Sequence, residues 1–191
     1  GDGKVYLEGG KSADIEIRFR HPRSNARCRL DWAVPNDKMP DAQRLMERAV
    51  NDGTKIFIIQ SADEWSEFIA VNSKAVFKDK FFVGTNWLGG VMFNKPHDIF
   101  KELPVGNALN WPYQALIHTG VERMGLVMEG EELLVGAYHT YPMAIGTAMG
   151  IVPMGKGSVL FSTLDIYGNI INDSAAGLVA KKLIFNMIDF K

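Results

Sequence analysis

Few residues of this chain combine the type and the placement that chemistry requires. Asp165 directly follows Ser158–Leu164, a run with the β-branched and aromatic residues typical of a buried strand. Ligands of open α/β sheets gather at the carboxyl ends of strands. Asp165 is therefore the first catalytic candidate, with His139 or His118 as its partner in a hydrolase. An aspartate in this position more often caps the following helix or braces a loop, and we favour that interpretation.

The motifs of nucleophilic, metal and nucleotide chemistry are missing from the sequence. Neither Gly-x-Ser-x-Gly nor Gly-x-Cys-x-Gly occurs, so the nucleophile turn of a serine or cysteine hydrolase is not predicted. The single cysteine, Cys28, alternates with Leu30 and Trp32 and is interpreted as a core residue. The four histidines lack metal-ligand spacing, and the glycines around Gly155 fit no phosphate-binding fingerprint. We expect no metal and no cofactor.

A second group of candidates is aromatic and lies in predicted loops or at strand ends. Flat rings beside Asn, Gln and His can stack on sugar faces while their neighbours bind the hydroxyls. The favoured interpretation is that these rings cover the ends of the sheet or pack on a neighbouring domain. The candidate ligand-binding residues are Trp87, Trp111, Tyr113, Tyr138 and Tyr141.

The composition is that of a globular domain without a charged partner surface. The 191 residues are 47% apolar and 23% charged, with a formal net charge of −1. This charge gives no reason to expect nucleic acid or a membrane as a partner. The chain begins at Gly1 with neither an initiator methionine nor a signal-peptide core, as expected of a piece taken from a longer protein in which an export signal can precede it.

Hydrophobic periodicity changes along the chain and predicts two regions. Residues 4–34 alternate between apolar and polar side chains, which predicts antiparallel strands in a β-extension or linker over residues 1–36. From residue 37 to residue 191 the pattern is α/β. A helical stripe over residues 42–50 ends at Gly53, and Lys55–Gln60 reads as a central strand buried on both faces.

The rest of the chain alternates short strands with turns and closes with a helix. Ser61 and Glu64 predict a capped second helix. Residues 147–152 and 158–164 are expected to pair across the Gly155-Lys-Gly157 turn. From Ser174 the pattern is helical, with Ile188 assigned to the apolar face and Asn186 to the polar face.

Four phrases of this sequence resemble a known domain type. They are MERAVNDGTKIFIIQ (46–60), PHDIFKELP (96–104), MGKGSVLFSTLD (154–165) and AAGLVAKKLIFNMI (175–188). Together they resemble the glutamine-amidotransferase-like, flavodoxin-like accessory domain of bacterial glycoside hydrolases. The nearest picture is the C-terminal part of family 2 β-galactosidase-like enzymes, and the trimerisation domain of family 42 β-galactosidases is a more distant one. The resemblance covers roughly residues 40–190.

The resemblance implies a fold class and a role. The fold would be a three-layer α/β sandwich with a mostly parallel central sheet, preceded by the N-terminal antiparallel strands. The domain would be non-catalytic, because the glycosidase carboxylates of such enzymes lie in a separate barrel domain. It would support domain packing, oligomerisation or carbohydrate contact in a periplasmic or secreted enzyme. The alternatives are a stand-alone hydrolase and a carbohydrate-binding module, each with its site at the strand carboxyl ends.

Overall fold

The structure is a computed structural model that describes residues 42–60, 62–83, 90–106, 108–109, 111–118, 124–140 and 143–190. The chain divides into two compact units, residues 1–41 and 42–191, and the described residues belong to the second. The predicted N-terminal strands and Cys28 therefore lie outside the described residues, as does Ser61, the expected cap of the second helix.

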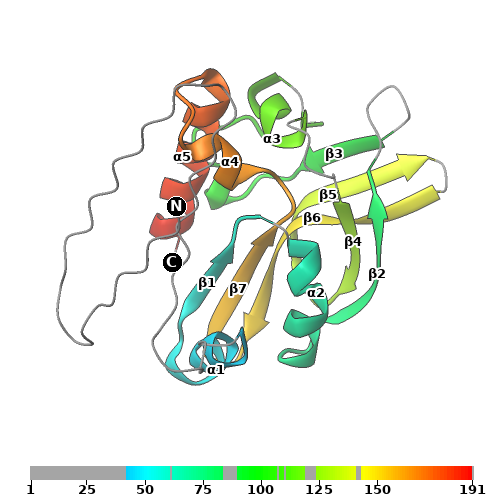
Figure 1. The fold of residues 1–191 in the computed structure, drawn as a ribbon, viewed down its shortest axis with the longest axis vertical. Helices are drawn as coiled ribbons and strands as arrows, with labels where there is room; N and C mark the ends of the chain where they lie inside the picture. The colour runs from blue at the N-terminus through cyan, green and yellow to red at the C-terminus, as the bar shows by residue number, and fades with distance from the viewer. Residues whose placement is uncertain are drawn as a thin grey trace, which may run out of the picture. The chain divides into compact units, whose positions relative to one another are not determined.

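The described unit is an α/β fold built on one seven-stranded sheet (Figure 1). The elements, with η for a 3-10 helix, are α1 (Ala42–Asp52), β1 (Lys55–Ile58), α2 (Ala62–Val71), β2 (Val76–Phe82), β3 (Gly90–Asn94), η2 (Asp98–Phe100), η3 (Trp111–Tyr113), α3 (Gln114–His118), β4 (Met124–Glu129), β5 (Glu132–Thr140), β6 (Met143–Met154), β7 (Gly157–Ser162), α4 (Ile166–Ile170) and α5 (Ala175–Asp189).

The sheet is mostly antiparallel, so the predicted mostly parallel sheet is wrong. The main strand order is β1-β7-β6-β4-β2, while β5 pairs with β6 and β3 pairs with β5. Among the described pairs only β1 and β7 run parallel. Short connections explain the difference, because two or three residues can join antiparallel neighbours but a parallel pair needs a long crossover.

β1 lies at one end of the strand order rather than in its centre, against expectation. Both of its faces are nevertheless covered. Ile56 and Ile58 pack in one hydrophobic core, whereas Phe57 and Ile59 pack against the other. A continuous apolar run indicates that both faces of a strand are buried. It does not indicate whether both edges of the strand have hydrogen-bonded neighbours. The predicted central position of this strand is therefore wrong, although the predicted burial of both faces agrees with the structure.

Two hydrophobic cores lie on opposite faces of the sheet. Consecutive residues of β7 alternate between them, with Val159 in one core and Leu160 in the other. The first core is formed with α1 and α2 and includes Met46, Ala49, Ile69, Leu126 and Val159. The second is formed with α3, α5 and the 3-10 segments and includes Phe100, Leu116, Leu160, Leu183 and Met187. Helices on both faces are compatible with a three-layer arrangement.

Aromatic rings rest on glycines at three places in the sheet. In each pair a phenylalanine stands directly opposite a glycine on the neighbouring strand. A Cβ atom on any of these glycines would come closer than 3.0 Å to the ring. The absent side chain thus provides the space that the ring fills, and cross-strand packing of this kind fixes the register. The pairs are Phe81–Gly125, Phe93–Gly136 and Phe161–Gly150.

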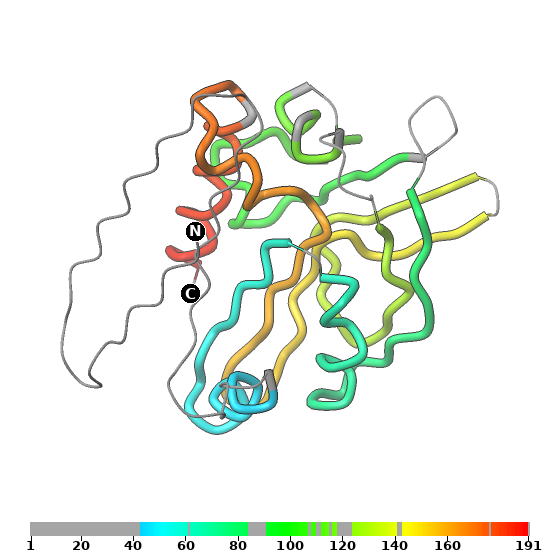
Figure 2. Tube along the Cα trace, in the orientation of Figure 1, coloured from blue at the N-terminus to red at the C-terminus, as the bar shows by residue number. Residues whose placement is uncertain are grey.

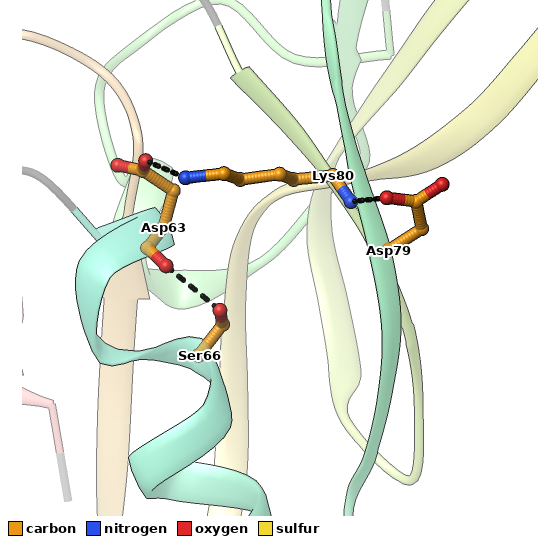
Figure 3. Close-up of polar contacts among 4 residues, drawn as sticks. All are labelled: Asp63, Ser66, Asp79 and Lys80. Carbon is orange, nitrogen blue, oxygen red and sulfur yellow. Dashed lines mark hydrogen bonds and ion pairs between the residues drawn. The ribbon is translucent and has the colours of Figure 1, made fainter.

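A polar contact joins α2 to the edge strand β2 (Figure 3). Lys80 Nζ lies 2.9 Å from Asp63 Oδ2 in the first turn of α2. The Asp63 carbonyl accepts a hydrogen bond from the buried hydroxyl of Ser66, and Lys80 N donates to Asp79 Oδ1. The charged residues of β2 also discourage pairing of this edge with other strands.

The turn between β6 and β7 packs against the end of α1, and Figure 2 shows the chain reversing there. β6 and β7 pair as predicted. Gly53, with φ of 77°, ends α1, also as predicted. Lys156 N donates to Val50 O at 3.0 Å, so the turn satisfies a carbonyl of the last helical turn. A Cβ on Gly157 would overlap the carbonyl oxygens of Thr54 and Ala49.

We expect Gly157→Ala to lower the free energy of unfolding by about 3 kcal/mol, because rigid backbone atoms surround the position. Gly106→Ala is the matched control, since that glycine has φ of 75° but open space around it. The control should cost only about 1 kcal/mol of backbone strain. Chemical denaturation measures both variants, and equal losses would contradict the close packing of this turn.

Candidate functional site

Asp165 lies at the carboxyl end of β7, where it was predicted, and it caps α4. Its side chain is buried, and Oδ1 accepts a hydrogen bond from Gly168 N at 2.9 Å. Asn169 Nδ2 donates to the Asp165 carbonyl at 2.8 Å and lies 3.4 Å from Oδ2. These contacts fit the favoured interpretation of a helix-capping aspartate.

The two histidine candidates have different relations to Asp165. His139 is on β5, opposite Gly90 of β3 and Ala144 of β6, and β5 does not pair with β7. His118 ends α3, and the Asp165 amide donates to Leu116 O at 2.9 Å, so the backbones of α3 and Asp165 are adjacent. The His118 side chain is outside the described residues. Strand pairing thus does not bring His139 and Asp165 together.

Of the aromatic candidates, Trp87 and Tyr141 lie outside the described residues, as does the side chain of Trp111 at the start of η3. Tyr113 is buried, and its hydroxyl donates to Pro104 O at 2.7 Å. Asn94 Nδ2 donates to the same carbonyl at 2.9 Å and lies 3.2 Å from the Tyr113 hydroxyl.

This buried network has an electrostatic consequence. Burial raises the pKa of Tyr113 to about 12, because the phenolate would lose its hydration, and the hydrogen bond from Asn94 opposes this only in part. The ring also meets Phe100 edge-on, with 6.4 Å between the ring centres. Together with Asn94 of β3, Tyr113 therefore holds the Pro104 carbonyl beside this strand. Its ring is buried and is not exposed for stacking on a ligand.

Metal binding has no support among the described side chains, which contain no group of three or more His, Cys, Asp and Glu placed to hold an ion. His97 illustrates the structural use of such residues. Its Nδ1 accepts from Ile99 N at 3.2 Å and so caps η2. Within the described ranges, none of the helices combines the length and the apolar character needed to span a bilayer.

α5 exposes apolar side chains that the sequence pattern did not predict. Ile188, assigned to the buried face, is 66% exposed, and Asn186, assigned to the polar face, is only 7% exposed. The correction has a physical cause: Asn186 Nδ2 donates to Ile99 O and Lys101 O, both at 2.9 Å, and these bonds hold the amide against the η2 segment on the buried side of α5.

The exposed residues of α5 form a row that we call the α5 stripe: Leu178, Phe185 and Ile188, which are 64%, 65% and 66% exposed. Their spacing of seven and three residues places them on one side of the helix. α4, which packs on α5, exposes two more large side chains, Tyr167 at 59% and Ile171 at 88%.

A second exposed apolar surface lies on the sheet, and we call it the hairpin face: Phe93, Met143 and Ile145. Tyr138, the remaining aromatic candidate, stands between Val91 and Ile145 in the strand register and is half-buried. Figure 1 shows the β5–β6 hairpin extending past α2. α1 and α2 cover the same face of the sheet elsewhere, because Leu126 of the α2 core pairs with Thr147 of β6.

Comparison of the chain with family models, with curated proteins and with solved structures finds no match.

We expect Asp165→Ala to lower the free energy of unfolding by about 1–2 kcal/mol, through loss of the cap on α4. Asp165→Asn is the control, because asparagine caps helices about as well and should lose much less. Thermal and chemical denaturation test this. Equal loss in both variants would show that the charge of Asp165, rather than its capping geometry, stabilises the fold.

Tyr113→Phe should cost about 1 kcal/mol at pH 9, because it removes the hydrogen bond to Pro104. The folded protein holds the Tyr113 proton up to a pKa of about 12, whereas the unfolded chain releases it near pH 10. The stabilisation is therefore complete below about pH 10 and declines as the pH rises toward 12. Denaturation at pH 9 and pH 11 should show a smaller cost at pH 11, whereas the exposed control Tyr167→Phe should cost nothing at either pH.

Proposed function

We propose that this chain is a non-catalytic accessory domain of a bacterial glycoside hydrolase, in which it makes contacts with other domains or subunits. The proposal includes the flavodoxin-like, glutamine-amidotransferase-like form of the three-layer fold and a periplasmic or secreted location. The four sequence phrases that resemble this domain type support it, and so does the α/β fold with helices on both faces of the sheet.

The observation that carries the docking role is the apolar surface of α4 and α5. If each large side chain presents on the order of 200 Å² in full, the five exposed residues leave about 700 Å² accessible. The largest apolar patch of a typical monomer is about 300–600 Å², and a stable interface buries about 800 Å² on each partner. Exposed apolar area of this size on two helices that pack together supports contact with another folded partner.

The environment of the catalytic candidates favours the accessory role over a hydrolase. The Asp165 carboxylate is buried and accepts hydrogen bonds that brace α4. A general acid or base needs geometry that lets it reach a substrate proton. Tyr113, one of the sugar-stacking candidates, is used inside the core.

Carbohydrate binding is the second candidate function, and one observation favours it. The ring of Phe93 rests on Gly136 and is 41% exposed, and Tyr138 lies two residues further along β5 on the same face. Two rings on one sheet face can form a platform for the apolar face of a sugar.

We expect the chain to hydrolyse no nitrophenyl glycoside or ester above the rate of its Asp165→Asn variant, because Asp165 acts as a cap. It should also show no retardation in gels containing soluble polysaccharides. Turnover that disappears in Asp165→Asn would support the hydrolase instead. Retardation that disappears in Tyr138→Ala and Phe93→Ala would support the carbohydrate-binding module.

Phe185→Glu tests whether the α5 stripe is free of the chain's own core. Measured at sub-micromolar protein concentration, its free energy of unfolding should stay within about 0.5 kcal/mol of the wild type, as for other surface substitutions. Leu183→Glu, on the buried side of the same helix, should prevent stable folding. A large loss in Phe185→Glu would mean that this chain itself covers the stripe, and would remove the support for docking.

A further inference from the structure

We propose that the α5 stripe binds a second copy of this chain, with the two α5 helices antiparallel across a twofold axis that passes beside Phe185. The inference rests on the proposed docking role and names its partner. It is carried by the pattern of charges around Phe185, by the exposure of Phe185 and Ile188, and by the low net charge of the chain.

Three residues of α5 form a ridge whose charges are complementary to those of the same ridge on a second, antiparallel copy. Lys181, Phe185 and Asp189 follow one another at intervals of four residues, which places them about 6 Å apart along one ridge of the helix. The exposed phenylalanine is in the centre, and opposite charges lie at equal distances on either side. A twofold axis at Phe185 puts Lys181 of one copy beside Asp189 of the other, and the same contact forms a second time.

Ile188 flanks this ridge beside Phe185 and lies within the stretch 181–189 where the two antiparallel helices overlap. Leu178 lies outside that stretch, because the position opposite it on the partner falls beyond Asp189, the last residue of α5.

Lys181 can exchange its ion-pair partner at little cost in stability. Lys181 Nζ lies 3.1 Å from Asp173, whose side chain is 99% exposed. An ion pair this accessible to solvent contributes little to stability, so Lys181 is able to change its partner. The formal net charge of −1 means that two copies do not repel each other over long range.

The hairpin face provides the matched control. Ile145 is 64% exposed and Phe185 is 65% exposed, so Ile145→Glu and Phe185→Glu each place one charge on an equally accessible apolar position. Sedimentation velocity of the 191-residue chain between about 1 and 100 μM should show a dimer. Phe185→Glu should weaken association at least tenfold, and Ile145→Glu should leave it unchanged.

A charge exchange tests the twofold arrangement itself. Lys181→Glu and Asp189→Lys should each weaken the dimer about threefold to tenfold, because each places like charges opposite one another in two symmetric contacts. The double variant restores opposite charges and should return association to within about twofold of the wild type. Circular dichroism and thermal unfolding of each variant confirm that the monomer remains folded.

The outcomes separate this inference from the proposed function. A chain that stays monomeric at 100 μM, or a dimer that Ile145→Glu disrupts and Phe185→Glu does not, overturns the twofold pairing. A monomer whose Phe185→Glu variant is fully stable and inactive still supports docking to a different domain. Single charge variants that are not rescued by the double variant overturn the Lys181–Asp189 contact.

Discussion

The sharing of one edge of β6 between two strands is the constraint on which the rest of the fold depends. β5 pairs along the other edge of β6 from residue 143 to residue 151, so β7 and β4 must take the same edge in succession. The change occurs at Thr163, whose hydroxyl bonds to Met124 O at 2.8 Å and to Ala148 O at 3.1 Å. Gly146 allows the approach, because a Cβ there would come within 3.0 Å of the Leu126 backbone.

The division of this β6 edge between β7 and β4 explains which parts of the sheet face are covered by helices. β7 and β1 lie on one side of the division and pack against α1, whereas β4 and β2 lie on the other side and pack against α2. The outer part of the β5–β6 hairpin lies beyond both helices, so Met143 and Ile145 remain exposed. On the opposite face α5 is held by Asn186 and by its buried row, which leaves the α5 stripe directed away from the sheet.

Local features were predictable because short-range chemistry determines them. The end of α1 at Gly53 and the β6–β7 hairpin both follow from residue type and spacing. The preference for Asp165 as a cap has the same basis and fits its contacts in the structure. The burial of Tyr113 was not predictable, because it depends on Pro104 and Asn94, which come from separate segments.

The sequence by itself determined the class of most elements, the glycine turns and the absence of recognisable nucleophile and nucleotide motifs. Only the tertiary structure decided that the sheet is mostly antiparallel, that β1 is a terminal strand and that Ile188 rather than Asn186 faces solvent. Periodicity records how many faces of an element are apolar. It does not record which strand supplies a hydrogen-bond partner or which carbonyl needs an amide, since those depend on residues that are distant in the chain.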